Sequence, residues 1–189
     1  MGIITMELAE IIKQQIATDG PVSFHDFMEM ALYHPELGYY NRRQDQIGRQ
    51  GDFYTSSSLT SVFGAMIAKQ LEEMWQLTGQ GKFTIVEYGA GTGLLCHDIL
   101  AYLKSNSPLY DALHYAIIEK SPSMRERQQL GLSEKVGWYD AIAQLGEITG
   151  CILSNELIDN FAVHQVVMED ELLEVFVDHR DSFAEFLRP

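Results

Sequence analysis

The segment Lys82–Leu94, which reads KFTIVEYGAGTGL, constrains the fold more than any other part of the chain. Thr84–Val86 is a short β-branched apolar run of the kind that fills a buried parallel strand. Glycines follow at alternate positions, Gly89, Gly91 and Gly93, and the residues after them carry apolar side chains at helical spacing. A strand, a glycine-rich turn and a helix form the first half of a nucleotide-binding βαβ unit. We therefore expect an α/β fold.

The spacing of the glycines separates two classes of nucleotide cofactor. A dinucleotide site has the pattern G-x-G-x-x-G, which seats a pyrophosphate on the N-terminus of the helix. This chain has G-x-G-x-G, with an acidic residue, Glu87, at the strand end before the first glycine. The next apolar run, Tyr115–Ile118, ends in Glu119, a carboxylate placed to accept from two ribose hydroxyls. Together these features resemble motif I and its partner acid in class I S-adenosylmethionine methyltransferases. The alternative is an ordinary βαβ crossover whose glycines serve only the turn.

Two further buried strands are predicted, and each is followed by polar side chains. Val136–Trp138 leads to Asp140, and Cys151–Ser154 leads directly into Asn155 and Glu156. In an open α/β sheet, ligands bind outside the carboxyl ends of the strands. We therefore expect these three polar residues to share one rim with the acids that end the first two strands. The alternative for the Asn–Glu pair is that it caps the next turn.

The helix between the second and third of these strands has a clear start. Ser121 is suited to the N-cap and Pro122 to the first helical position. The helix is expected over Ser123–Leu130, with Arg125 and Arg127 on its exposed side.

The N-terminal part of the chain is predicted to be helical. Apolar residues at three- and four-residue steps indicate an amphipathic helix over residues 4–18. Ser23 can cap a second helix, with Asp26 as its capping-box partner. Residues 41–60 are polar and aperiodic, and a helix follows to about Leu77, capped by a Ser or Thr near 58–60.

The C-terminal part shows one hairpin. Val163–Met168 and Leu172–Val177 flank an acidic turn and read as two strands, whereas residues 178–189 show no strong pattern. No glycine- or proline-rich linker is present. We expect an N-terminal helical region with a long polar loop over residues 1–80 and an α/β core over residues 81–189.

Charge and composition exclude several classes of function. The net charge of −14 and the pI near 4.7 argue against nonspecific binding to nucleic acid phosphates or to anionic membranes. An acidic protein suits a basic partner, although solubility explains the charge equally well. Cys96 and Cys151 form no metal-ligand cluster and the six histidines never fall at zinc spacing, so we expect no metal and a reducing compartment. No targeting or transmembrane segment is visible, which predicts a soluble, cytosolic chain.

Five stretches taken together resemble the MidA-like family of class I methyltransferases. The mitochondrial relatives in that family are arginine methyltransferases that assist assembly of respiratory complex I. The resemblance covers roughly residues 24–168, in the right order. The matching stretches are Leu32–Pro35 with Gly38–Tyr40, Gly51–Ser56, Glu87–Gly93, Glu119 with Ser121–Ser123, and Asn155–Asp159.

The resemblance implies a Rossmann-like class I methyltransferase sheet with an N-terminal helical region. It also implies that the loop carrying Asp52 and Thr55 closes over S-adenosylmethionine. Family members are about twice as long and complete a seven-stranded sheet, so we expect a sheet that is incomplete at its C-terminal side, in a fragment or a shortened protein. A sheet edge left by missing strands would favour self-association, which makes a homodimer possible.

The resemblance also assigns roles along the cofactor. Gly89, Gly91 and Gly93 would let its amino acid end pack on the backbone. Its ammonium group would be held by Glu87 or Asp52, its ribose by Glu119 and its adenine amino group by Asp140 or a neighbour.

The acceptor nitrogen would arrive at Asn155, Glu156 and Asp159. Two carboxylates could grip an arginine guanidinium bidentately, whereas an Asn would suit an amide or amine acceptor. The leading hypothesis is therefore an S-adenosylmethionine-dependent methyltransferase acting on an arginine side chain of a protein. It would work in the bacterial cytoplasm, or in the mitochondrial matrix if the source is eukaryotic.

Two other hypotheses remain. One is a non-catalytic module for assembly or interaction, which keeps the fold and binds the cofactor without turnover. The other is an NAD-linked oxidoreductase, which the G-x-G-x-G spacing disfavours.

Overall fold

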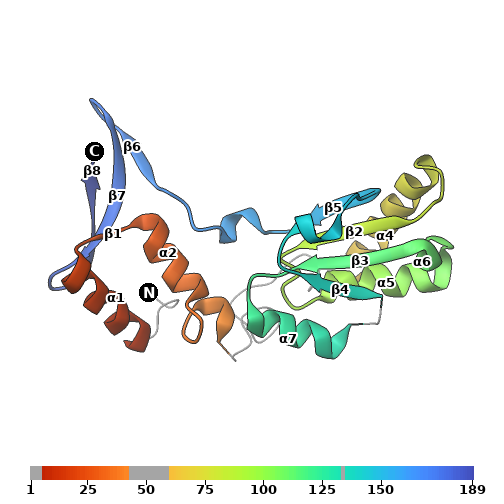
Figure 1. The fold of residues 1–189 in the computed structure, drawn as a ribbon, viewed down its shortest axis with the longest axis horizontal. Helices are drawn as coiled ribbons and strands as arrows, with labels where there is room; N and C mark the ends of the chain where they lie inside the picture. Colours follow the sequence, from red (N-terminus) through yellow and green to blue (C-terminus); the bar gives the residue numbers. More distant parts are fainter. Residues whose placement is uncertain (1–5, 43–59, 133–134) are drawn as a thin grey trace. The chain divides into compact units, whose positions relative to one another are not determined.

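The computed structural model describes residues 6–42, 60–132 and 135–189. The chain forms two compact units, one from residues 44–157 and the other from residues 1–43 together with 158–189 (Figure 1). Asp52 and Thr55, which were predicted to cover the cofactor, lie outside the described residues.

The unit of residues 44–157 is built on a parallel sheet in the order β4-β3-β2-β5. Its strands are β2 (Phe83–Tyr88), β3 (Leu113–Ile118), β4 (Val136–Tyr139) and β5 (Gly150–Ser154). Ile85 in the central strand β2 pairs with Tyr115 on one side and with Cys151 on the other. All four predicted strands are confirmed, and parallel strands joined through helices confirm the Rossmann-like α/β class.

The helices of this unit are α4 (Ser61–Leu77), α5 (Leu94–Asn106), α6 (Leu109–Ala112) and α7 (Pro122–Gly131), with a 3-10 turn η2 (Ile142–Leu145). Two of them, α4 and α7, begin at the side-chain caps that the sequence predicts. Thr60 caps α4 by accepting from Val62 N, and Ser121 caps α7 by accepting from Met124 N. Each side chain satisfies one of the backbone donors that a helix start leaves without a partner.

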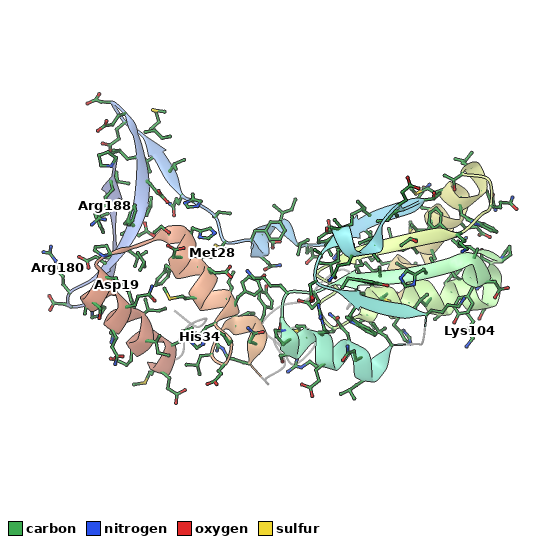
Figure 2. All side chains as sticks on the ribbon, viewed as in Figure 1. Asp19, Met28, His34, Lys104, Arg180 and Arg188 are labelled. Atoms are coloured by element: carbon green, nitrogen blue, oxygen red, sulfur yellow. The ribbon has the colours of Figure 1, made fainter. Side chains whose placement is uncertain are left out.

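The core of the unit lies between the sheet and the helices α4 and α5. Alternate residues of β2 and β3, such as Ile85 and Ile117, are fully buried against Leu71 of α4 and Ile99 of α5. Because α5 starts at the glycine-rich turn and packs along its whole length, its N-terminus is fixed at the carboxyl end of β2 (Figure 1). Lys104, in the last turn of α5, marks the opposite end of the unit (Figure 2).

The other unit joins the two ends of the described chain. Its elements are α1 (Met6–Asp19), β1 (Val22–Ser23), α2 (Phe24–Tyr33), η1 (Tyr39–Asn41), η3 (Ile158–Asn160), β6 (Val166–Met168), β7 (Leu172–His179) and β8 (Phe183–Arg188). The strands form an antiparallel sheet in which β7 pairs with β1, β6 and β8. Leu8, Ile12 and Ile16 of α1 pack with Val22 and Val177 in its core.

The sequence predicted most of this unit. The two N-terminal helices are confirmed, as is the cap of α2, in which Ser23 Oγ accepts from Asp26 N. The hairpin of β6 and β7 is also confirmed. Strand β8 was missed, because its stability comes from pairing with β7 and not from an apolar alternation of its own.

The two compact units do not divide the chain at residue 80, the boundary that the sequence predicts. Helix α4 packs in the core of the parallel sheet, and β7 pairs with β1 near the N-terminus. Among the described residues, no helix has the length and apolar character needed to cross a membrane.

Candidate functional site

The glycine-rich turn takes backbone conformations that other residues rarely adopt. The φ angle is +65° at Gly89 and +81° at Gly93. A Cβ atom at Gly89 would lie 2.5 Å from Cδ1 of Leu157, and one at Gly93 would lie 3.1 Å from Cδ1 of Leu132. Gly93 is also the N-cap of α5, so the free N–H groups of the first helical turn meet the rim here. The turn therefore requires glycine both for its positive φ angles and for close packing against Leu157 and Leu132.

Glu87 lies inside the core beside this turn. Its side chain is 2% exposed, and its carboxyl oxygen accepts a 2.7 Å hydrogen bond from the Tyr115 hydroxyl. Burial, together with the charge of Glu119, raises the pKa of Glu87 to about 7, although the Tyr115 hydrogen bond acts in the opposite direction. From this position the carboxyl meets Tyr115 and not solvent. That Glu87 or Asp52 holds the ammonium group stays a prediction.

Glu119 follows β3 and is held at both carboxylate oxygens. Oε1 accepts from Ser121 N at 2.9 Å, and Oε2 accepts from Gln128 Nε2 at 3.1 Å. Burial raises the pKa of Glu119, and these hydrogen bonds oppose the rise. The side chain is therefore fixed in one orientation at the rim, as a ribose-binding carboxylate requires.

Arg125 has a different place from the exposed helix face that the sequence suggested. Its Nη2 donates to the carbonyl oxygens of Glu119 and Tyr139, at 3.2 and 3.1 Å, and to Asp140 Oδ1 at 2.8 Å. The prediction of a solvated Arg125 was wrong, because the carboxyl ends of β3 and β4 supply three acceptors beside helix α7. Arg125 thus connects these two strand ends through hydrogen bonds. It also forms an ion pair with Asp140, the carboxylate predicted to bind the adenine amino group.

A pocket opens at the carboxyl ends of β3 and β4. Its volume is about 470 Å³, within the usual range for small-molecule sites. The lining residues are Ile118, Glu119, Lys120, Pro122, Arg125 and Asp140. Two of the residues predicted for ribose and adenine, Glu119 and Asp140, are therefore brought together.

The first two acceptor candidates lie at the end of β5. Asn155 Nδ2 donates to Glu156 Oε1 at 3.4 Å, and Glu156 has a φ of +51°, which is uncommon for a residue with a side chain. In the sheet, β2 separates β5 from β3, so the two residues lie on the far side of the glycine-rich turn from the pocket. Strained residues of this kind cluster at functional sites.

The third acceptor candidate, Asp159, lies in η3 of the other compact unit. Its neighbour Asn160 is held by two tyrosines of the stretch Leu32–Tyr40. Tyr33 donates to Asn160 O at 3.0 Å, and the Tyr40 hydroxyl is hydrogen-bonded to Asn160 Oδ1. These contacts fix the backbone that carries Asp159.

Sequence reasoning missed two buried polar residues of the site, Gln128 and Tyr115. Gln128 is 0% exposed and reaches Gly91 and Trp138 as well as Glu119. The available signal was a polar side chain four residues after Met124, on the apolar face of a short helix. Among the described residues, no group of three or more potential metal ligands lies together.

A parallel sheet, a glycine-rich turn and a fixed acid after the next strand define a Rossmann-like protein built for a nucleoside cofactor. Residues 66–189 match the Methyltransf_28 family, described as "Putative S-adenosyl-L-methionine-dependent methyltransferase". The chain belongs to this family.

Relatives and a solved structure agree with this assignment. The chain is 27% identical to the protein arginine methyltransferase NDUFAF7 homolog of Drosophila melanogaster mitochondria, over 93% of this chain and 45% of that protein. It is also 27% identical to human mitochondrial protein arginine methyltransferase NDUFAF7, over 92% of this chain and 45% of that protein. A COG1565 superfamily member from Burkholderia thailandensis, solved with S-adenosyl-homocysteine bound, matches with a TM-score of 0.82 and 29% identity, over 97% of this chain and 50% of that one. The chain thus spans about half the length of the relatives it matches.

Proposed function

We propose that this chain forms the cofactor-binding part of a methyltransferase that modifies an arginine side chain of a protein. The observation that carries the proposal is the pocket at the ends of β3 and β4, where a fixed Glu119 lies beside the glycine-rich turn. Membership of the methyltransferase family and the names of the mitochondrial relatives support it.

The residues fit S-adenosylmethionine, which supplies an electrophilic methyl group on a sulfonium when it is bound. Gly89 and Gly93 give the turn its positive φ angles, and Gly93 is the N-cap of α5, where backbone N–H groups of the first helical turn are available to a ligand. Glu119 presents an oriented carboxylate to the ribose hydroxyls. Asp140, with its charge partly balanced by Arg125, lies where an adenine amino group can donate.

The acceptor would be held by Asn155 and Glu156 at the end of β5, and the role of Asp159, which lies in the other compact unit, stays a prediction. Methyl transfer by in-line displacement needs positioning and desolvation more than covalent help. An arginine guanidinium offers five donors to carboxylates, and an acidic protein favours the approach of a basic segment. We further propose the role that the resemblance to the MidA-like family implies, assistance in the assembly of respiratory complex I. The protein would work in the mitochondrial matrix of a eukaryote or in the cytoplasm of a bacterium.

A second candidate is a module that binds the cofactor without turnover. The observation favouring it is strand β5, which among the described residues pairs only with β2 and leaves Ile152 62% exposed; such a module could associate through this edge, including with a second copy.

Calorimetric titration tests the cofactor, and a transfer assay then separates the two candidates. The wild-type chain should bind S-adenosyl-homocysteine in the micromolar range and should not bind NAD. The Glu119→Ala variant should not bind S-adenosyl-homocysteine. Mass spectrometry of an arginine-rich peptide incubated with chain and S-adenosylmethionine should then show a gain of one methyl group. Binding without any gain would favour the non-catalytic module, and binding of NAD instead would refute the methyltransferase.

A further inference from the structure

Gln128 is a buried amide at a position that an apolar side chain could fill. It is 0% exposed in α7, whose other buried residue is Met124. Removing an amide from water is unfavourable unless the protein replaces its hydrogen bonds, and a leucine or methionine would carry no such penalty. The presence of glutamine therefore calls for an explanation in its partners.

The three hydrogen bonds of Gln128 join three segments of the rim. Nε2 donates to Gly91 O in the glycine-rich turn at 2.8 Å and to Glu119 Oε2 after β3 at 3.1 Å. Oε1 accepts from the indole N–H of Trp138 in β4 at 3.0 Å. Both hydrogens of the amide and its oxygen are thus used, and the indole fixes which end of the amide faces the acid.

We infer that Gln128 is a positioning residue for the cofactor, acting through Glu119 and Gly91. The inference rests on the proposed function. Ser121 N holds one oxygen of the Glu119 carboxylate and Gln128 the other. Since a carboxylate has about four lone-pair sites, these hydrogen bonds leave acceptor capacity for a ribose hydroxyl. Gln128 thereby sets the orientation of the acid and its distance from the turn.

A substitution at the next residue gives a matched control. Gln128→Glu keeps the length of the side chain and the acceptor for Trp138, but it removes both donors of Nε2. Gln129→Glu makes the same chemical change one position along α7, where the side chain is exposed. Loss of a hydrogen bond to a charged group predicts at least about tenfold weaker binding of S-adenosyl-homocysteine for Gln128→Glu and little change for Gln129→Glu.

A double-mutant cycle separates positioning from a structural role. Gln128→Glu is made in the wild-type chain and again in Glu119→Gln, and all four dissociation constants are measured by calorimetry. Because the oriented carboxylate is already absent from Glu119→Gln, the loss caused by Gln128→Glu should shrink by at least about threefold. If Gln128→Glu does not fold, Gln128→Met, which places no second charge in the core, takes its place.

Two results would overturn the inference. One is a Gln128 variant that binds as tightly as Gln129→Glu, and the other is an equal loss in both backgrounds, as a general loosening of the fold would give. A wild-type chain that binds no S-adenosyl-homocysteine would instead refute the proposed function itself. The two failures are therefore distinguishable.

Discussion

Gly89 allows two physical requirements of the glycine-rich turn to be measured separately. Its φ of +65° is strained for any residue with a Cβ atom. A Cβ atom there would also lie 2.5 Å from Cδ1 of Leu157, well inside van der Waals contact. Gly89→Ala therefore meets backbone strain and a steric clash together. Gly79, in the same compact unit, has a φ of +94° with nothing within 4 Å of its added Cβ, so Gly79→Ala meets only the strain.

The magnitudes follow from these two terms. A left-handed backbone costs an ordinary residue about 1–2 kcal/mol. Pushing the end of the flexible Leu157 side chain off its rotamer adds about 1 kcal/mol. We expect Gly89→Ala to lower the free energy of unfolding by about 2–3 kcal/mol and Gly79→Ala by about 1–2 kcal/mol. The excess at Gly89 should largely disappear in a Leu157→Ala background, where no Cδ1 remains to be displaced.

Urea unfolding followed by tryptophan fluorescence measures these differences. The two tryptophans of the chain, Trp75 and Trp138, both lie in the unit that contains the turn, so the signal reports on that unit. If Gly89→Ala is no more destabilising than Gly79→Ala, the argument that Leu157 packs against the turn is wrong.

Three further predictions concern charge and backbone. Burial raises the pKa of Glu87 from 4.5 to about 7, so its protonated form stabilises the fold fully below pH 4.5 and this contribution is lost as pH rises through 7. Urea unfolding of Glu87→Gln should lack this decline, which is worth up to about 3 kcal/mol; an unchanged pH profile would count against a buried neutral acid. Arg125→Ala removes the link between the ends of β3 and β4, so it should lower stability by about 1 kcal/mol and weaken calorimetric binding of S-adenosyl-homocysteine, whereas exposed Glu126→Ala should do neither. Glu156→Gly removes a carboxylate at a position where φ is +51°, a conformation that glycine adopts without strain. The free energy of unfolding should therefore change by less than about 1 kcal/mol. Methyl transfer should nevertheless fall while cofactor binding holds, and retained transfer would exclude Glu156 from acceptor binding.

The features that sequence predicted are those set by neighbouring residues along the chain. Thr60 and Ser121 cap their helices because a side-chain oxygen reaches a backbone N–H only two or three residues away. The strand, turn and helix around Gly89 are likewise encoded within one short segment. The order of these segments then places Glu119 and Asp140 at one edge of the sheet, because parallel strands present their carboxyl ends together.

The features that sequence missed depend on partners distant in the chain. Arg125 has a charged side chain of the kind that usually lies in solvent. Its hydrogen bonds to the carbonyl of Tyr139 and the carboxylate of Asp140, which the sequence does not reveal, make it a connection between strands. Gln128 acquires its role from Gly91, 37 residues earlier in the sequence. Local propensity contains no information about such contacts, so tertiary structure decides them.

Three acids that look alike in sequence end in three electrostatic states. Glu87 is shielded from water, and its raised pKa favours the neutral form as pH falls below 7. Glu119 is half-buried but receives hydrogen bonds at both oxygens, and the charge of Asp140 is countered by Arg125 at 2.8 Å. Because a carboxylate must be oriented to accept from two hydroxyls, Glu119, which is held at both oxygens, is the one of the three that the fold prepares for a ribose. Glu119→Ala should therefore weaken binding of S-adenosyl-homocysteine more than Asp140→Ala, and the opposite order would move the ribose to the other side of the pocket.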